Sequence, residues 1–230
     1  MGFTFNYPNY TIGENAYDEI EKVCLKYGTT AVVIGGKTAM SKAKPFLDNA
    51  LKDSNINIID YLWYGGEASN ENAHRLSLEE SVKKADMIFA VGGGKAIDTC
   101  KEVHIITGKP LFTFPTIAST CAATTKIAIM YYPTGESKET LVMDRPPIHI
   151  FINTRIIADA PSEYLWAGIG DTIAKNYEVS FSCRNRNLDY LNSMGLQLAP
   201  LTSETLIKYG VKAYEDIKKH ICSKELEEVI

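Results

Sequence analysis

Residues 87–101 (MIFAVGGGKAIDTCK) hold the pattern most suited to chemistry, with three glycines and a lysine directly after an apolar run. Glycine lets the backbone turn tightly and approach a ligand with no Cβ in the way. A helix beginning at these glycines would direct its free N–H groups and positive dipole end at a pyrophosphate, and Lys95 would add a charge. The spacing matches neither GxxxxGK[ST] nor GxGxxG. We favour phosphate binding over the alternative of a plain strand-to-helix turn.

A second polar segment, residues 114–125 (FPTIASTCAATT), follows another apolar run. Ligands of open α/β sheets bind at the carboxyl ends of the strands, so these small hydroxyl side chains are placed to bond ribose or phosphate oxygens. Taken alone, the segment is also typical of an ordinary Ser/Thr-rich loop.

A third segment, residues 167–175 (AGIGDTIAK), places two glycines inside a predicted helix. Each glycine costs about 1 kcal/mol there relative to alanine, which indicates a close approach of the backbone to another element or to a ligand. Asp171 beside them is either a carboxylate of a site or a helix cap or surface residue, and the residues alone leave both readings open.

The elements that position these segments alternate along the first two-thirds of the chain. Apolar, β-branched runs predict strands at 31–34, 56–63, 87–91 and 111–114. Helical spacing predicts helices at 16–27, at 38–53 with Pro45 inside, at 69–85 with Ser69 as its cap, and after Lys95. This alternation predicts an α/β fold with an open parallel sheet and helices on both faces.

The pattern changes after residue 123. Further strands are predicted at 127–132, 138–143 and 149–153, and only helices follow Pro161, at 162–182, 187–209 and 211–230. We therefore expect an α/β domain at 1–155 and an all-α domain at 156–230. An apolar stripe (Ile217, Ile221, Leu226, Ile230) continues to the last residue with no stop signal. We expect the helical domain to be incomplete, and a natural helix that ends with the chain is the alternative.

The composition narrows the class of protein. The 230 residues are 45% hydrophobic and 23% charged, as in globular chains. A net charge of −4 without a basic run argues against a nucleic-acid partner. No apolar stretch approaches the about 18 residues of a membrane span, and the first residues do not resemble a signal peptide, so we expect no membrane partner. Five scattered cysteines without a CxxC pattern favour reduced thiols and a cytoplasmic location.

Four motifs together resemble those of the iron-containing, or group III, alcohol dehydrogenases, and most closely the glycerol dehydrogenase branch. They are GGGKAIDTCK at 92–101, PTIASTCAATT at 115–125, IMYYPTGE at 129–136 and APSEYLWAGIGDTIAKNYE at 160–178. The resemblance implies a dinucleotide-binding α/β domain followed by an all-α domain, an architecture shared with dehydroquinate synthase. It also implies NAD or NADP as cofactor and, in a complete chain, a divalent metal, zinc or iron.

The resemblance also implies roles for individual residues. Gly93, Gly94 and Lys95 would hold the pyrophosphate of the cofactor, and Asp98 would orient that loop. The cofactor site would be completed by Thr116, Ser119, Thr125, Ile127 and Tyr131. Asp171 would be the first metal ligand, and no catalytic side chain is assigned.

Three positions depart from the family pattern. The family's other two metal ligands are histidines on helices beyond this chain's last residue, and the chain's own four histidines (His74, His104, His149, His220) lie in no matching motif. Cys121 stands where glycerol dehydrogenases have an Asp that contacts the polyol. Gly36 stands where many relatives have an Asp that bonds the ribose 2′-OH, and Lys37 follows it.

The resemblance implies that the protein is an NAD(P)-dependent oxidoreductase that transfers hydride between nicotinamide and a small hydroxy or oxo substrate. The departures bear on which substrate and which cofactor it uses. Cys121 resembles a subgroup that reduces 2-oxo acids to 2-hydroxycarboxylates, and packing as a small apolar residue is its alternative. Gly36 makes NADP(H) an option beside NAD(H). A truncated, non-catalytic nucleotide-binding remnant is the alternative function, and a dehydroquinate synthase-like lyase is less favoured. A homo-oligomer is left open.

Overall fold

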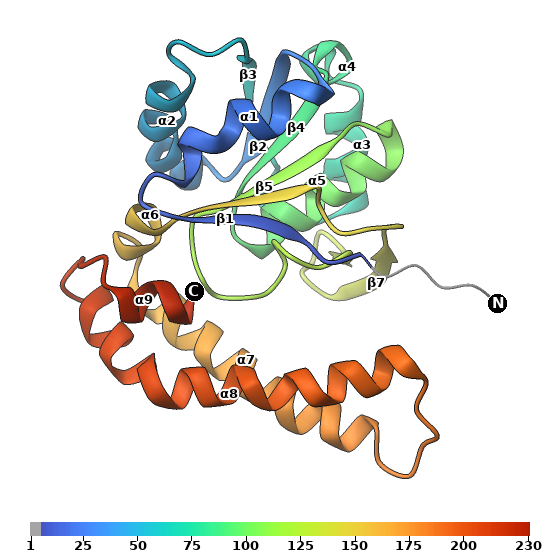
Figure 1. Cartoon of the computed structure of the whole chain (residues 1–230). Helices are drawn as coiled ribbons and strands as arrows, with labels where there is room; N and C mark the ends of the chain where they lie inside the picture. The colour runs from blue at the N-terminus through green and yellow to red at the C-terminus, as the bar shows by residue number, and fades with distance from the viewer. Residues whose placement is uncertain (1–5) are drawn as a thin grey trace. The chain divides into compact units, whose positions relative to one another are not determined.

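A six-stranded parallel sheet forms the centre of the first part of the chain (Figure 1). The computed structural model describes residues 6–230, and its strand order is β1-β8-β5-β4-β2-β3, with every neighbouring pair parallel. The strands are β1 Asn9–Gly13, β2 Thr30–Gly35, β3 Asn57–Trp63, β4 Met87–Gly92, β5 Leu111–Pro115 and β8 His149–Asn153. The predicted parallel α/β fold is therefore confirmed, and β1 is an additional strand that the sequence pattern missed.

The sheet is covered on both faces because its strands are apolar on both sides. On one face, aromatic side chains of β4, β5 and β8 pack together; the ring centroids of Phe89 and Phe114 are 4.8 Å apart, and those of Phe114 and Phe151 are 5.0 Å apart. Tyr17 and Leu47 close this core from the helical side. The opposite face of the sheet packs against the helix that follows the glycines.

All but the last of the helices in this part connect successive strands, and the last follows β8 (Figure 1). They are η1 Ala16–Glu19, α1 Ile20–Cys24, η2 Leu25–Tyr27, α2 Lys37–Leu51, α3 Asn70–Ser77, α4 Glu80–Lys84, α5 Gly94–Thr107 and α6 Thr154–Ala158. The prediction of one helix at 69–85 is wrong, because the extended backbone of Glu79 (φ −62°, ψ 136°) separates α3 from α4. Ser69 caps α3 as predicted, since its side chain accepts the N–H of Asn72.

A two-stranded antiparallel hairpin lies outside the main sheet. It consists of β6 Ile127–Tyr131 and β7 Ser137–Val142 and turns at residues 133–135, close to the predicted bounds. The backbone of β6 pairs with β7 on one side only, so the N–H and carbonyl groups on its other edge need partners elsewhere.

The chain packs as two compact units. One runs to Ile117 and continues at Cys121–Ile156, and the other comprises Ala118–Thr120 and Ile157–Ile230. The second unit is built on α7 Ser162–Ser182, α8 Tyr190–Ile217 and α9 Lys224–Val229, around a core that includes Leu165, Ala213 and Leu226. No helix among residues 6–230 has both the length and the apolar character needed to cross a bilayer.

The two helices expected at 187–209 and 211–230 are placed differently in the structure. α8 runs through Gly210, where an added Cβ would lie 3.8 Å from Cδ1 of Ile169 on α7, so this glycine lies at the packing surface of the helix pair. The chain turns instead at residues 218–223, where His220 has a φ of 56°. Ile221 is therefore in a turn and half exposed, while Ile217 and Leu226 are buried.

Candidate functional site

The carboxyl ends of the six parallel strands place several predicted site residues along one edge of the sheet. Backbone hydrogen bonds tie neighbouring strand ends together: the N–H of Gly36 donates to the carbonyl of Val91 (3.3 Å), and the N–H of Thr116 donates to that of Gly92 (3.2 Å). Thr116 is buried at this edge. Ligands of open α/β sheets bind at this edge, so a nucleotide site is expected there.

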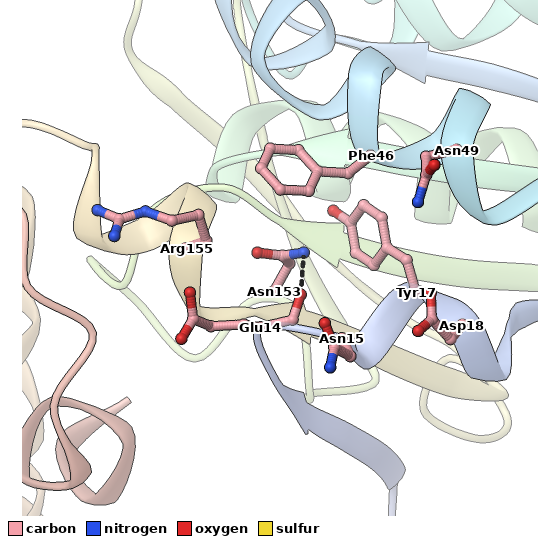
Figure 2. A pocket seen from close by; sticks show the side chains of 8 residues that line it. All are labelled: Glu14, Asn15, Tyr17, Asp18, Phe46, Asn49, Asn153 and Arg155. Carbon is pink, nitrogen blue, oxygen red and sulfur yellow. Dashed lines mark hydrogen bonds between the residues drawn. The ribbon is translucent and has the colours of Figure 1, made fainter.

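A pocket of about 240 Å³ lies where β1 and β8 end (Figure 2). It is lined by Glu14, Asn15, Tyr17, Asp18, Phe46, Asn49, Asn153 and Arg155. The Asn153 side chain bridges two segments, because its amide donates to the carbonyl of Glu14 (2.8 Å) and its oxygen accepts the N–H of Ile156 (3.1 Å). The Tyr17 hydroxyl is buried without a hydrogen-bond partner in the described part of the chain, and burial raises its pKa. Sequence reasoning missed this pocket because its residues come from separate segments.

The glycine turn between β4 and α5 has the geometry expected of a phosphate cradle. Gly92 has a φ of 149°, a conformation that other residues rarely adopt, and a Cβ on Gly93 would lie 2.6 Å from Cδ1 of Ile117. α5 begins at Gly94, and no side chain caps its N-terminus. The first N–H groups of the helix therefore have no intrahelical acceptor and lie at the carboxyl edge. A helix start of this kind is one at which phosphate groups can bind.

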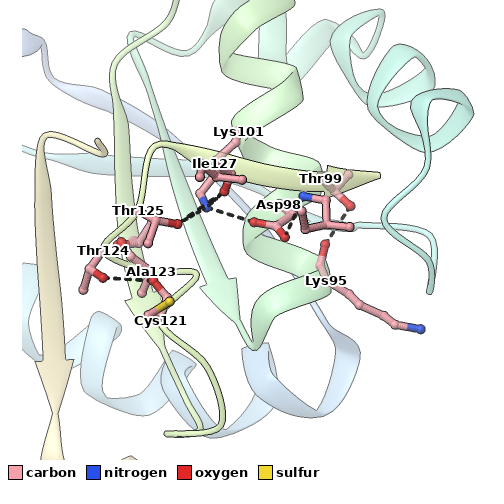
Figure 3. A network of polar contacts seen from close by, with 11 residues as sticks. Lys95, Asp98, Thr99, Lys101, Cys121, Ala123, Thr124, Thr125 and Ile127 are labelled. Atoms are coloured by element: carbon pink, nitrogen blue, oxygen red, sulfur yellow. Dashed lines mark hydrogen bonds and ion pairs between the residues drawn. The ribbon is translucent and has the colours of Figure 1, made fainter. Parts of the chain in front are cut away.

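Lys95 is held by a partner that the sequence did not indicate. Its ammonium forms an ion pair with Glu67 (2.7 Å) and lies 5.8 Å from the centroid of the Tyr131 ring. The hydrogen bond with Glu67 raises the pKa of Lys95. Figure 3 shows the Lys95 side chain extending away from Thr125 and Cys121. A phosphate at the glycine turn would therefore compete with Glu67 for this ammonium.

Asp98 and Lys101 form a buried ion pair on α5 (Figure 3). The Lys101 ammonium is fully buried and donates to Oδ1 of Asp98 (2.9 Å), to Oγ1 of Thr125 (3.4 Å) and to the carbonyl of Ile127. The other Asp98 oxygen accepts the N–H of Ile129 (3.2 Å). Burial lowers the pKa of Lys101, and its ion pair with Asp98 opposes that shift. Asp98 thus contacts β6, whereas the resemblance implied that it orients the glycine loop.

The other predicted cofactor residues fall into both units. Thr125, Ile127 and Tyr131 lie on or just before β6, in the first unit, together with the glycine turn. Ser119 belongs to the second unit. Cys121 is exposed, and its carbonyl accepts both the N–H (3.0 Å) and the hydroxyl (2.9 Å) of Thr124, which makes a tight turn.

Asp171 does not sit in a metal site within the described chain. Its carboxylate, 39% exposed, forms an ion pair with Lys175 on the next turn of α7 (3.4 Å). Across residues 6–230, no three side chains of His, Cys, Asp or Glu come close enough together to hold a metal ion. The residues present therefore do not fit a catalytic zinc or iron, which usually needs three protein ligands.

The two glycines beside Asp171 differ in their surroundings. A Cβ on Gly168 would lie 2.1 Å from the carbonyl oxygen of Ala118, so this position requires glycine because the backbone of another segment lies against it. A Cβ on Gly170 would meet nothing within 4 Å. The expected close approach to another element is thus confirmed at Gly168, and no other described element approaches Gly170.

Gly36 has room for a side chain. It precedes α2 in an extended conformation (φ −73°, ψ 143°), and a Cβ there would lie 3.7 Å from Cβ of Ala39, an ordinary contact. The ammonium of the following Lys37 lies 4.5 Å from the centroid of the Trp63 ring. The position therefore accepts either glycine or aspartate without a change of backbone.

Comparisons with known proteins identify the family and the fold. Residues 8–151 match the family described as iron-containing alcohol dehydrogenase. Glycerol dehydrogenase of Thermotoga maritima is 37% identical over 174 residues, which cover 73% of this chain and 47% of that protein. Hydroxycarboxylate dehydrogenase A of Escherichia coli is 30% identical over 187 residues, which cover 81% of this chain and 51% of that protein. The chain thus spans about half the length of these relatives.

Solved structures extend the likeness over the whole fold. The crystal structure of glycerol dehydrogenase from Schizosaccharomyces pombe superposes with a TM-score of 0.87 at 27% sequence identity. The superposition covers 98% of this chain and 58% of the other.

Proposed function

Because the chain belongs to the iron-containing alcohol dehydrogenase family, we propose that it binds NAD(H) or NADP(H) at the carboxyl edge of its sheet. The observation that carries the proposal is the glycine turn. The backbone at Gly92 has a conformation that favours glycine, and α5 begins just after it without a side-chain cap. Water can satisfy the free N–H groups at that helix end, and a pyrophosphate, with its charged acceptors, would bind them more strongly.

The proposed roles follow the positions of the side chains. Gly93 and Gly94 leave space and amides for the pyrophosphate, and Lys95 neutralises its charge. The rest of the cofactor site is proposed at Thr116, Ser119, Thr125, Ile127 and Tyr131. When bound, the nicotinamide of such a cofactor accepts or donates a hydride, and the chain binds and orients it.

The proposed activity is oxidoreduction at a CH–OH group of a small hydroxy or oxo substrate. Two relatives support it by name, a glycerol dehydrogenase and a hydroxycarboxylate dehydrogenase. The exposed side chain of Cys121 favours the second class of substrate, because it places no carboxylate where a substrate carboxylate would bind. The described residues do not supply a three-ligand metal set, so the proposal for this chain contains no step at a metal.

Calorimetric titration with NADH and NADPH tests the cofactor site. Gly94→Val places a branched side chain at the first residue of α5 and should abolish binding. Gly195→Val is the matched control, since a Cβ at Gly195 on α8 meets nothing within 4 Å. Equal affinity of the unsubstituted chain and Gly94→Val would show that the glycine turn is not the cofactor site.

The substrate class is tested separately, in the presence of NADH. Saturation-transfer NMR should detect binding of a 2-oxo acid more strongly than binding of glycerol. Cys121→Asp should reverse that order, because it restores a carboxylate that repels an acid and accepts hydroxyl groups. Stronger glycerol binding by the unsubstituted chain would show that Cys121 does not select the substrate class.

A further inference from the structure

The open edge of β6 is closed by side chains of α5. Strand residues alternate in direction, and Lys126 faces β7, since its carbonyl accepts the N–H of Met143 (2.8 Å). Ile127 and Ile129 therefore direct their N–H and carbonyl groups to the opposite edge, where no strand pairs with them. The Lys101 ammonium donates to the carbonyl of Ile127, and the Asp98 carboxylate accepts the N–H of Ile129.

This arrangement replaces a neighbouring strand with a buried ion pair. A third backbone contact continues it, because the N–H of Tyr131 donates to the carbonyl of Ala68 (2.7 Å). Three successive residues of the same edge are thus fixed, two of them by side chains of one helix. A fully buried ammonium is costly unless several acceptors surround it, and Lys101 has three.

The fixed segment is the one proposed to contact the cofactor. Lys101 also donates to the hydroxyl of Thr125 (3.4 Å), and α5 itself begins at the glycine turn. The ion pair therefore connects the helix under the pyrophosphate with the strand that carries Ile127 and Tyr131. A shift of this strand would move both residues relative to the glycine turn.

We propose that Lys101, assisted by Asp98, is a positioning residue of the nucleotide site, which holds the segment from Thr125 to Tyr131 in its binding conformation. This inference rests on the proposed cofactor site. It adds a residue that does not itself touch the cofactor, because the Lys101 side chain is wholly enclosed by protein. The alternative is that Lys101 only neutralises Asp98 inside the fold.

A double substitution separates these two roles. Lys101→Met removes the donors but leaves Asp98 buried and unpaired, which destabilises the fold for electrostatic reasons alone. Asp98→Asn combined with Lys101→Met removes both charges, and the amide introduced in place of the carboxylate still has an oxygen that accepts the N–H of Ile129. If Lys101 only neutralises Asp98, the double variant recovers every property of the unsubstituted chain. If Lys101 positions β6, the double variant recovers stability without recovering cofactor affinity.

Two readouts decide between these outcomes. Titration with NADH and NADPH should show at least tenfold weaker binding by the double variant, while Lys84→Met, at an exposed lysine of α4, binds as the unsubstituted chain does. Hydrogen exchange without cofactor should show faster exchange confined to residues 125–131. Guanidinium unfolding verifies that the double variant is folded. Should it not fold, Lys101→Gln, which keeps a shorter donor beside Asp98, is measured in the same two ways.

The outcomes distinguish the positioning role from the cofactor site itself. Unsubstituted affinity and unchanged exchange in the folded double variant, or in Lys101→Gln if that variant takes its place, would overturn the positioning role alone. Failure of the unsubstituted chain to bind either dinucleotide would overturn the proposed cofactor site and, with it, the positioning role.

Discussion

Lys95 and Glu67 form an ion pair of 2.7 Å between the first turn of α5 and the loop before α3. The second Glu67 oxygen accepts the N–H of Ala68 (3.0 Å), so the carboxylate is fixed at both oxygens. Glu67 is the more buried partner, with a side chain 19% exposed against 55% for Lys95. Lys95 is thus the more exposed and less constrained partner, so a phosphate could draw its ammonium away while Glu67 keeps its bond to Ala68.

Glu67→Gln should strengthen dinucleotide binding. The substitution keeps a hydrogen-bond acceptor for Ala68 but removes a negative charge that competes with the pyrophosphate for Lys95. Partly exposed charges of this kind contribute roughly 0.6 kcal/mol, so we expect about a threefold gain in affinity for NADH. Calorimetry measures it, with Glu80→Gln as a control that breaks a comparable exposed pair with Lys83 on α4. A loss of affinity would mean that Lys95 binds phosphate only when Glu67 orients it.

Gly36→Asp should discriminate against NADP(H). The site has room for the new side chain, and an Asp at the N-cap of α2 also accepts helix N–H groups, so the fold should not lose stability. The carboxylate would repel a 2′-phosphate and accept a ribose 2′-OH. We expect NADPH affinity to fall by about tenfold or more while NADH affinity is kept or improved. An equal change for both dinucleotides in parallel titrations would remove Gly36 from the ribose site.

The parts of the site that lie within one segment could be predicted from the sequence. The glycine turn follows directly from the apolar run of β4 and the glycines after it. The contacts of Lys95 with Glu67 and of Lys101 with Ile127 could not be predicted, because these residues lie 28 and 26 positions apart in the chain. Such pairs depend on how the sheet brings loops together.

The difference between local pattern and long-range packing also explains why β1 was missed and why a helix break was predicted at Gly210. β1 is a short strand with no fully buried residue, and it pairs with β8 about 140 residues away, so little in its own sequence marks it. The predicted helices break at Gly210, but in the structure α8 continues through this residue, and a Cβ there would make only an ordinary contact of 3.8 Å with Ile169. A single glycine costs a helix only about 1 kcal/mol relative to alanine, so packing of the rest of α8 can carry the helix through it.

Asp86 should stabilise the fold in a pH-dependent way. Its carboxylate accepts the N–H groups of Thr29 (2.9 Å) and Thr30 (2.9 Å) and the hydroxyl of Thr30 (2.8 Å), and these hydrogen bonds lower its pKa. A lowered folded-state pKa contributes stability that is present above the unfolded pKa of about 4 and is lost as the pH falls through the folded value.

Asp86→Asn should therefore lower the urea midpoint at pH 7 more than at pH 3. Two series of unfolding curves at fixed salt measure the difference. Asp53→Asn, an exposed aspartate in the turn after α2, should change neither midpoint. A difference between Asp86→Asn and the unsubstituted chain that is the same at both pH values would assign the effect to the shape of the side chain and not to its charge.

Asp171 should not hold a metal in this 230-residue polypeptide. The carboxylate is paired with Lys175, and no second or third ligand accompanies it within residues 6–230. A single carboxylate exchanges its metal readily with water, since a catalytic zinc usually has three protein ligands. With a dissociation constant of about 1 mM, 0.1 mM Zn²⁺ would stabilise the fold by only about 0.1 kcal/mol.

Thermal unfolding with and without 0.1 mM Zn²⁺ or Fe²⁺ (roughly a tenth of that dissociation constant) tests this prediction. The melting temperature should not change, and Asp171→Asn should behave as the unsubstituted chain does. Because exposed thiols also bind zinc, the same measurement on Cys121→Ser shows whether any shift comes from that cysteine. A rise of several degrees that disappears in Asp171→Asn but persists in Cys121→Ser would contradict the prediction. Such a rise would mean that further ligands reach Asp171, and dilution of the protein would then show whether a second copy of the chain provides them.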